Sequence, residues 1–326
     1  MNILVIGLGS MGKRRISLIQ ELYPDFVVVG VDKRDDRVES VLEQFKIPCF
    51  NSIEIAHEKY SIGTAFVCTA PLSHNTIITE CLQNKWNVFS ELNLVSGGYE
   101  KNIELAKKNR CKLFLSSTFL YREEIMHIKN KVEMYQRWNY IYHVGQYLPD
   151  WHPWENYTEF FVGNKRTNGC REIMAIEFPW LIQTFGKVTN THVQADKMTD
   201  LNINYCDNYT IQIEHENGNK GILIIDVVSP VAVRRLEIYR EQQYIRWNGT
   251  PDSLYEYDTE KDFLKQIQLY VSEEHRPGYR TFIVENAYKN EIIEFMEMIL
   301  KDKQPQYSFE QDLEVLKLLD RIEDEI

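Results

Sequence analysis

The sequence has no long hydrophobic run, no closely spaced pair of cysteines and no excess of basic residues. A membrane-spanning helix needs about 20 consecutive apolar residues, and no stretch comes close, so we expect no membrane span and no membrane partner. The first residues already have the character of a strand, so we expect no signal peptide. The six cysteines are scattered without a CxxC pair, which predicts reduced thiols in a cytoplasmic protein without a disulfide framework or a bound metal.

The charge balance excludes one large class of partners. The chain has 37 Lys and Arg against 48 Asp and Glu, a net charge of −11. A protein that binds nucleic acid needs a basic surface to neutralise phosphates, so we expect no nucleic-acid partner. The 44% hydrophobic and 26% charged content is ordinary for a globular protein. At 326 residues the chain exceeds the usual size of one hydrophobic core, which favours two domains.

A glycine-rich loop follows the first predicted strand. Residues 2–6 form a short apolar run typical of a buried parallel strand. In a dinucleotide-binding loop the first glycine permits a tight turn, the second admits a pyrophosphate, and the third lets the next helix pack closely. Residues 13–22 have helical spacing, so the pyrophosphate would lie at a helix N-terminus, where amides and dipole favour an anion. We therefore expect a dinucleotide to be bound by Gly7, Gly9, Ser10, Met11 and Gly12.

The residues after the second predicted strand bear on which dinucleotide binds. Residues 27–31 form this strand, and Asp32 follows it, twenty residues after Gly12. A carboxylate there can accept the adenine-ribose hydroxyls, which favours NAD. Lys33 and Arg34 come next and can instead hold the 2′-phosphate of NADP. We expect NAD as the cofactor, with NADP as the alternative.

The first third of the chain alternates strands and helices. This βαβ pattern predicts an α/β fold with a doubly wound parallel sheet. Because the carboxyl ends of parallel strands meet at one edge, we expect the cofactor there, near Thr69, Ala70, Pro71, His74 and Glu91. The strands are expected around residues 48–50, 64–69, 87–90 and 112–116, and the helices at 36–45, 74–84 and 99–109.

From about Thr118 the pattern changes to long alternating strands joined by turns. We expect a dinucleotide-binding domain over 1–118 and an α+β domain over 119–326, with an open, mostly antiparallel sheet. The C-terminal helix is also considered to pack back on the first domain. An uncovered apolar sheet face needs a partner, which predicts a homo-oligomer through this sheet. Strands are expected at 139–147, 192–196, 209–215, 221–228, 236–240 and 243–247, and helices at 123–135, 286–300 and 309–326.

Four motifs carry a resemblance to a known family. They are the nucleotide loop 6–15, the turn Thr69-Ala70-Pro71 with His74, the strand Val88-Phe89-Ser90-Glu91, and the C-terminal segments 286–295 and 308–312. Together they resemble the glucose–fructose oxidoreductase/inositol dehydrogenase (Gfo/Idh/MocA) family. The resemblance covers essentially the whole chain and implies an NAD(P)-dependent oxidoreductase with a Rossmann domain. The segment 145–154 (GQYLPDWHPW) also resembles members from bacterial surface-polysaccharide pathways, which implies a sugar or nucleotide-linked sugar as substrate.

Two departures from the family pattern affect the chemistry. The family's Glu-Lys-Pro motif reads Glu91-Leu92-Asn93 here, and leucine cannot assist proton transfer as the lysine does. The family's acid/base histidine aligns with Ile176. Hydride transfer from a carbon that bears a hydroxyl still requires a base for the hydroxyl proton. The resemblance therefore implies the cofactor more strongly than it implies the standard mechanism.

Four residues are candidates for catalytic roles: Glu91, Tyr121, His152 and Glu172. Glu172 lies on the helix that carries the family's histidine, and a buried carboxylate there would have a raised pKa unless it pairs with Arg171. His152 can act as acid or base near neutral pH. Tyr121 follows the last strand of the first domain, where we expect the cleft between the domains to begin. Glu91 is expected on the nicotinamide side, with Asn93 near the carboxamide.

Each candidate has a structural alternative. Arg171 and Glu172 can form a structural ion pair, His152 can belong to an ordinary packed aromatic loop, and Tyr121 can serve domain packing. Substrate contacts are expected from Arg122, Trp151, Trp154, Arg171 and Glu177. Two functions remain: an NAD(P)-dependent oxidoreductase acting on a sugar or nucleotide-linked sugar in surface-glycan biosynthesis, or an NAD-binding protein that is no dehydrogenase. The second would be a transient-redox epimerase or lyase, or a regulatory member.

Overall fold

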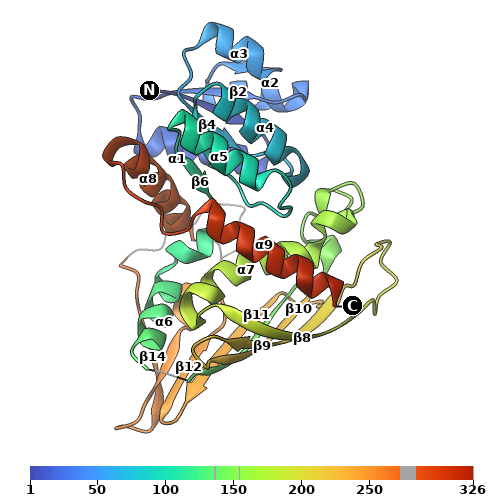
Figure 1. The fold of residues 1–326 in the computed structure, drawn as a ribbon, viewed down its shortest axis with the longest axis vertical. Coiled ribbons are helices and arrows are strands. Elements are labelled where there is room, and N and C mark those ends of the chain that lie inside the picture. Colours follow the sequence, from blue (N-terminus) through green and yellow to red (C-terminus); the bar gives the residue numbers. More distant parts are fainter. Residues whose placement is uncertain (136, 154, 272–283, 326) are drawn as a thin grey trace. The chain divides into compact units, whose positions relative to one another are not determined.

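The chain forms two compact units, which are described separately (Figure 1). The computed structural model describes residues 1–135, 137–153, 155–271 and 284–325. Unit 1 comprises residues 1–117 and 289–314, and unit 2 comprises residues 118–288 and 315–326. Helices α8 (Glu285–Lys301) and α9 (Phe309–Asp324) each contribute residues to both units.

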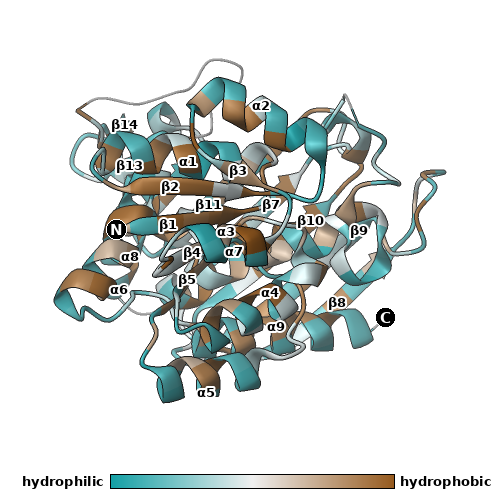
Figure 2. Cartoon of the chain, turned by 90° about the horizontal axis from the view of Figure 1, so that it is seen from above, coloured by the Kyte–Doolittle hydropathy of each residue, from teal (hydrophilic) through white to brown (hydrophobic). Residues whose placement is uncertain are grey.

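Unit 1 has the predicted doubly wound α/β fold, which is confirmed. Its six-stranded sheet is parallel throughout, with the strand order β3-β2-β1-β4-β5-β6. Helices α1 and α2 lie on one side of β1 and β2, and α4 and α5 lie on the other (Figure 2). The strands are β1 (Asn2–Ile6), β2 (Val27–Val31), β3 (Cys49–Phe50), β4 (Thr64–Val67), β5 (Asn87–Ser90) and β6 (Leu113–Leu115). The helices are α1 (Ser10–Leu22), α2 (Asp35–Phe45), α3 (Ile53–Lys59), α4 (Pro71–Gln83) and α5 (Tyr99–Asn109).

A ladder of phenylalanines holds the centre of the unit 1 sheet together. Phe66, Phe89 and Phe114 occupy paired positions on β4, β5 and β6. Their rings stack, with centroids 4.6 Å apart for the first pair and 4.9 Å for the second. Phe295 of α8 lies within 5.7 Å of all three rings and packs edge-on against Phe66 and Phe89. All four side chains are completely buried, so residues from the end of the chain complete the core of the N-terminal fold.

Unit 2 is an α+β unit with an eight-stranded sheet, in the order β14-β13-β12-β11-β7-β10-β9-β8. All neighbouring strands are antiparallel except β7 and β10, so the expected mostly antiparallel sheet is confirmed. The strands are β7 (Asn139–Gly145), β8 (Val188–Asp196), β9 (Asn208–His215), β10 (Lys220–Asp226), β11 (Val233–Arg240), β12 (Gln243–Trp247), β13 (Tyr255–Asp258) and β14 (Phe263–Gln266). The helices that lie wholly in this unit are α6 (Glu123–Glu133) and α7 (Gly169–Phe185).

One face of the unit 2 sheet packs against α7. Tyr140 of β7 stacks on Phe185 of α7 at 4.3 Å, and Tyr142 meets Trp180 edge-on at 5.4 Å. Gly221 of β10 lies beside the Tyr140 ring, where a Cβ atom would come within 1.9 Å of the ring, so only glycine fits there. The alternation of buried and exposed residues along β7 follows from this packing, because the side chains of a strand point to opposite faces.

The opposite face of this sheet carries exposed hydrophobic side chains. Ile141 of β7, Ile222 of β10 and Tyr239 of β11 are 40%, 37% and 40% exposed. Within the described ranges, no helix is long and apolar enough to cross a membrane. Nor do the described residues include a group of three or more His, Cys, Asp or Glu side chains that is able to hold a metal ion.

Candidate functional site

The glycine loop between β1 and α1 has the geometry of a phosphate-binding turn. Gly7 has a φ of +93°, and a Cβ atom there would lie 2.7 Å from the Cys68 carbonyl oxygen. A Cβ atom on Gly12 would lie 1.9 Å from the carbonyl oxygen of Gly7, so the helix packs onto the loop only with glycine. Gly9 precedes α1 and has no side chain to cap the first helical amides, and the first turn contains no acidic residue. The loop and the helix N-terminus therefore suit an anionic ligand.

Asp32, directly after β2, is tied to the glycine loop. Its Oδ2 accepts a hydrogen bond from the Leu8 amide at 2.7 Å, and its Oδ1 accepts one from the Arg34 amide at 3.0 Å. Each carboxylate oxygen has two lone pairs, so both keep acceptor capacity for the hydroxyls of a ribose. The Rossmann position of this carboxylate and the glycine loop fit an NAD(P) dinucleotide.

Arg37 is a residue of this site that the sequence patterns did not single out. Its Nη1 lies 3.5 Å from Asp32 Oδ2 and is the nearest atom, at 3.6 Å, to the position of a Cβ on Gly9. Arg34 instead turns outward and forms an exposed ion pair with Asp36 at 2.6 Å. Lys33 is exposed. Arg37 sits in the first turn of α2, five residues after Asp32, and only the folded turn brings its guanidinium over the glycine loop.

The turn between β4 and α4 is held by buried polar groups. The hydroxyl of Ser73 donates to the Ala70 carbonyl oxygen at 2.7 Å, and Pro71 opens the helix. His74 is 2% exposed, and its Nε2 lies 2.8 Å from the Thr69 carbonyl oxygen while its Nδ1 lies 2.7 Å from Asn93 Oδ1. Burial lowers the pKa of His74, although both hydrogen bonds and Glu91 oppose this. His74 and Asn93 therefore hold the Thr69–Pro71 turn in place through buried hydrogen bonds.

Glu91 directly follows β5 and belongs to a buried charge cluster. The Arg15 guanidinium is fully buried, and its Nε lies 2.6 Å from Glu91 Oε1 while its Nη2 lies 2.7 Å from Glu291 Oε2. The Ser116 hydroxyl donates to Glu291 at 2.9 Å. Burial raises the pKa of Glu291, and the nearby Glu91 charge adds to this while Arg15 opposes it. The Glu91 carboxylate is thus turned toward Arg15, a partner 76 residues away in sequence.

In unit 2, Glu172 has the most perturbed carboxylate among the predicted site residues. It lies in the first turn of α7, whose N-terminus is capped by the Asn168 side chain accepting from the Arg171 amide at 2.7 Å. The residue is partly exposed, yet one carboxylate oxygen is buried and has no hydrogen-bond partner among the described residues. Burial raises the pKa of Glu172 to about 8. A group with such a pKa can take or release a proton near neutral pH.

Arg171 does not pair with Glu172. Its buried guanidinium instead contacts Asp320 at 2.6 Å and also forms an ion pair with Glu323, both on the C-terminal part of α9 within unit 2. The Asn168 side chain also donates to Glu323 at 2.8 Å. The structural ion pair considered between Arg171 and Glu172 is therefore wrong, because Arg171 pairs with Asp320 and Glu323 instead. The Glu172 carboxylate thus has no ion-pair partner among the described residues.

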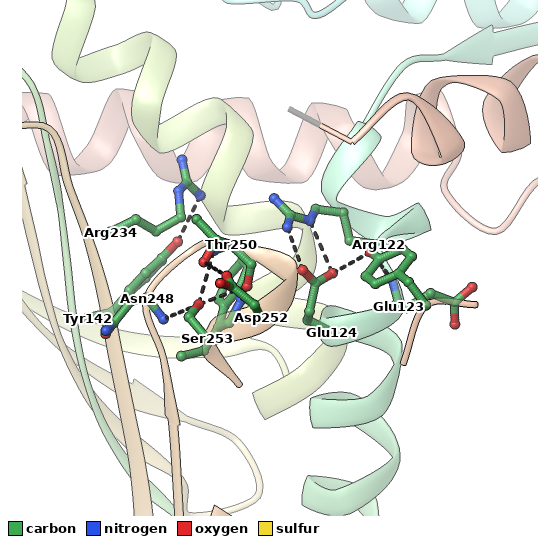
Figure 3. A network of polar contacts seen from close by, with 11 residues as sticks. Arg122, Glu123, Glu124, Tyr142, Arg234, Asn248, Thr250, Asp252 and Ser253 are labelled. Atoms are coloured by element: carbon green, nitrogen blue, oxygen red, sulfur yellow. Dashed lines mark hydrogen bonds and ion pairs between the residues drawn. The ribbon is translucent and has the colours of Figure 1, made fainter. Parts of the chain in front are cut away.

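Glu177 and Arg122, two of the predicted substrate residues, have different polar partners in unit 2. Figure 3 shows Arg122 beside Glu124, and Arg234, which contacts Glu177, beside Tyr142. Glu177 is completely buried and accepts hydrogen bonds from Tyr142 and Trp180 at 2.7 Å each and from Arg234 at 2.6 Å. Arg122 forms a two-point ion pair with Glu124 of α6 at 2.5 and 3.2 Å. Both arginines lie against the Phe119 ring, Arg234 at 4.2 Å and Arg122 at 5.5 Å from its centroid.

The remaining candidates lie around two loops of unit 2. Tyr121 is 7% exposed in a short helical turn, Thr118–Tyr121. His152 packs on Phe160 at 4.4 Å, and burial lowers the pKa of the imidazole although Glu155 opposes this. The Trp151 indole donates to the Gln146 carbonyl oxygen at 3.0 Å. Trp154 lies outside the described residues.

Comparison with family models finds a match to the N-terminal part of the chain. Residues 1–117 match the Gfo/Idh/MocA family, described as an oxidoreductase family with an NAD-binding Rossmann fold. No protein in a search of curated sequences matches the chain.

Similar solved structures match the whole chain. UDP-N-acetylglucosamine 3-dehydrogenase GnnA from Acidithiobacillus ferrooxidans superposes with a TM-score of 0.77 at 14% identity, over 100% of this chain and 97% of that one. The WlbA dehydrogenase from Chromobacterium violaceum, crystallised with NADH and UDP-GlcNAcA, gives 0.76 at 12% over 99% and 92%. Biliverdin reductase from Synechocystis sp. PCC 6803, crystallised with biliverdin and NADP+, gives 0.79 at 14% over 99% and 98%. At these identities the similarity establishes the fold.

Proposed function

We propose that this chain is an NAD(P)-dependent oxidoreductase acting on a sugar or nucleotide-linked sugar, because residues 1–117 match the Gfo/Idh/MocA oxidoreductase family with its NAD-binding Rossmann fold. The cofactor half of the proposal rests on Gly7, Gly12 and Asp32, whose geometry fits a dinucleotide. When bound, the nicotinamide supplies the hydride acceptor or donor. The residues of the chain bind and orient the cofactor and move the proton of the substrate hydroxyl.

The catalytic part of the proposed function rests on Glu172 and its raised pKa. The resemblance aligns the family's lysine and histidine with Leu92 and Ile176, neither of which can accept a proton. Glu172 lies on the same helix as Ile176, and its pKa of about 8 equips it to accept a hydroxyl proton during alcohol oxidation. In the reverse direction, the protonated carboxyl returns the proton to the carbonyl oxygen. His152 and Tyr121 remain secondary candidates, and Glu91 is assigned to positioning because its carboxylate faces Arg15.

The substrate class rests on two kinds of support. The segment 145–154 resembles members from surface-polysaccharide pathways, and two structurally similar proteins are described with UDP-linked sugars. A biliverdin reductase has a similar fold, so the fold alone does not select the substrate. The proposed substrate class therefore depends on the segment 145–154 and on the two similar proteins described with UDP-linked sugars. We propose a role in the cytoplasmic synthesis of surface-glycan precursors, with Trp151, Trp154 and the loop around His152 contacting the substrate.

A direct assay tests the function. Absorbance of the reduced nicotinamide is followed with NAD or NADP and a panel of UDP-linked and other nucleotide-linked sugars. We expect turnover with at least one of them, and a loss of about 100-fold or more in kcat in Glu172→Gln. Glu260→Gln, an exposed carboxylate of the same unit in the turn between β13 and β14, is the matched control and retains activity. Cofactor binding with no turnover on any sugar nucleotide would contradict the proposal.

A second function is favoured by the loss of both customary proton-transfer residues. A protein that holds NAD tightly and uses it only transiently, for epimerisation or elimination, shows no net change in nicotinamide absorbance. Mass spectrometry of the purified protein for retained nucleotide separates the two functions. Retained NAD, together with interconversion of sugar nucleotides at constant absorbance, supports this alternative.

We also propose that the protein forms a homo-oligomer through the exposed face of the unit 2 sheet. Ile141, Ile222 and Tyr239 supply the exposed hydrophobic area on neighbouring strands β7, β10 and β11. Light scattering of the wild type and of Ile222→Glu tests this. A monomeric wild type, or an oligomer unchanged by the substitution, would contradict the assignment of this face.

A further inference from the structure

The side chain of Arg234, near the start of β11, is held on three sides within unit 2. Its Nη1 donates to Glu177 Oε1 at 2.6 Å and to the Tyr142 hydroxyl oxygen at 2.9 Å, which uses both protons of that nitrogen. The guanidinium lies over the Phe119 ring, with its carbon 4.2 Å from the ring centroid. Gly249 lies against the aliphatic part, where a Cβ atom would come within 2.7 Å of Arg234 Cδ. These contacts fix the side chain before any ligand binds.

Three of the five N–H donors of Arg234 have no protein partner in the part of the chain that the structure describes. Neither Nε nor Nη2 meets an acceptor there, and neither atom is buried. The Arg234 side chain is 17% exposed, whereas that of Glu177 is completely buried. The guanidinium thus presents to solvent an open edge that consists of Nε and Nη2.

The same edge binds a carboxylate at two other arginines of this protein. Arg15 donates from Nε to Glu91 Oε1 at 2.6 Å and from Nη2 to Glu91 Oε2 at 3.3 Å. Arg122 donates from the same two nitrogens to Glu124 at 3.2 and 2.5 Å. These two N–H groups are parallel, and their spacing matches that of the two oxygens of a carboxylate. Arg234 therefore has the donor geometry for a carboxylate that no described residue supplies.

The charge at this edge favours a carboxylate over a diphosphate. Glu177 offsets the charge of Arg234, so the pair together offers the two donors with little net positive charge. A carboxylate has one negative charge and two oxygens in a plane, and it can accept from both donors. A diphosphate has at least two negative charges, which a single arginine already paired with Glu177 does not offset.

Arg234 also adjoins two parts of the proposed substrate site. It is paired in register with Val144 of β7, directly before the segment 145–154. Glu177, which contacts Arg234, lies on α7 five residues after Glu172. Helix α7 therefore carries both the residue that holds Arg234 and the proposed proton acceptor.

We propose that Arg234 binds a carboxylate group of the substrate, and that the substrate is therefore a sugar with a carboxylate, a uronic acid linked to a nucleotide. The inference rests on the proposed function, because it names the substrate class of that oxidoreductase. The carboxylate accepts hydrogen bonds from Nε and Nη2 while Glu177 and Tyr142 hold Nη1 (Figure 3). Arg234 selects and orients the substrate and takes no part in proton transfer.

Two probes that differ at one carbon of the sugar test the proposal. UDP-glucuronic acid and UDP-glucose have the same base and diphosphate, but only the first has a carboxylate on its sugar. Calorimetry with and without NADH gives their dissociation constants for the wild type, Arg234→Lys and Arg235→Lys. We expect the wild type to bind UDP-glucuronic acid about tenfold or more tightly than UDP-glucose, and Arg234→Lys to lose most of this preference, because lysine lacks the two parallel donors. Arg235→Lys, the matched control, alters the next residue on the opposite face of the strand and retains the preference.

A second variant guards against an effect of misfolding. Arg234→Lys keeps a cation beside Glu177, and thermal unfolding checks that this variant folds. Arg234→Met combined with Glu177→Gln removes both charges together, so no buried charge is left without a partner. We expect the double variant to lose the preference as well, while it binds UDP-glucose with the affinity of the wild type.

The proposal would be overturned by a wild type that shows no preference for the carboxylate, or by a preference that survives in both variants. Equal losses for the two probes would also overturn it, because they would assign Arg234 to the diphosphate. A failure of the proposed function gives a different result: the preference depends on Arg234, but no sugar nucleotide changes the nicotinamide absorbance. Turnover of uncharged sugar nucleotides without any carboxylate preference would retain the proposed function and overturn the role of Arg234.

Discussion

The guanidinium of Arg15 and the carboxylate of Glu91 form a buried ion pair, with 2.6 Å between Nε and Oε1. Arg15 lies in α1, which follows the glycine loop, and Glu91 directly follows β5, at the position that resembles the family's Glu-Lys-Pro motif. The pair therefore links two segments on which the proposed cofactor binding depends. It also accounts for a glutamate at this position without giving it a role in proton transfer.

Arg15→Leu is expected to destabilise the protein more than Glu91→Gln. The first substitution leaves two buried carboxylates, Glu91 and Glu291, without their cation, which costs about 3–5 kcal/mol. The second leaves Arg15 paired with Glu291 and costs about 1–3 kcal/mol. Urea unfolding at pH 7 measures both. The reverse order of the two free energies would show that the cluster is not held by Arg15.

Gly12→Ala is expected to lower stability by about 3 kcal/mol and to abolish dinucleotide binding, because the added methyl group meets the Gly7 carbonyl oxygen at 1.9 Å. Gly63→Ala is the control, since nothing lies within 4 Å of the Cβ position there. Thermal unfolding and NADH titration of both variants check this. Normal cofactor binding by Gly12→Ala would exclude the glycine loop as the phosphate site.

Arg37→Ala is expected to weaken NADPH binding about tenfold or more while NADH binding changes little. The guanidinium lies beside Asp32 and over Gly9, where it can form a charge-assisted hydrogen bond to a 2′-phosphate. Arg34→Ala serves as the comparison, because Arg34 is already paired with Asp36 in solvent. Calorimetric titration with both cofactors measures the change. Equal losses for NADH and NADPH would show that Arg37 does not distinguish them.

Glu172→Gln is expected to stabilise the protein relative to wild type at high pH. The folded-state pKa of about 8 lies above the ordinary value of 4.5, so the folded protein binds the proton more tightly than the unfolded chain does. Wild-type stability therefore falls as pH rises from about 4.5 to 8, while glutamine contributes no such dependence. Unfolding free energies of both proteins at pH 5, 7 and 9 test the sign. An advantage of the variant that does not grow with pH would mean that Glu172 has an ordinary pKa.

Local patterns allowed the nucleotide loop and the Rossmann topology to be predicted from sequence. Gly7, Gly12 and Asp32 are recognisable because a tight turn and a strand end require particular residues at fixed spacing. The charge cluster of Arg15 and Glu291 was not predictable, because its members lie 276 positions apart and meet only after folding. The same is true of the partners of Arg171 on α9, which the sequence offered no way to distinguish from Glu172.

Element boundaries followed the strength of the local pattern. Strand β12 at Gln243–Trp247 was predicted with its observed limits, and its buried residues Ile245 and Trp247 alternate with partly exposed neighbours. Strands β13 and β14 were missed, because each has four residues and neither has a buried face whose alternation reveals it. Helix α7 extends over 17 residues with an internal Pro179, and it was located only through the family resemblance.

The packing of Phe295 against the phenylalanines of β4, β5 and β6 has a consequence for folding during synthesis. A ribosome releases residues 1–117 long before α8 exists, so the emerging N-terminal fold has its aromatic ladder uncovered on one side. Its core is completed only when synthesis is nearly finished. The N-terminal fold therefore matures last in time although it comes first in sequence, and a C-terminally truncated chain would expose the ladder to chaperones and proteases.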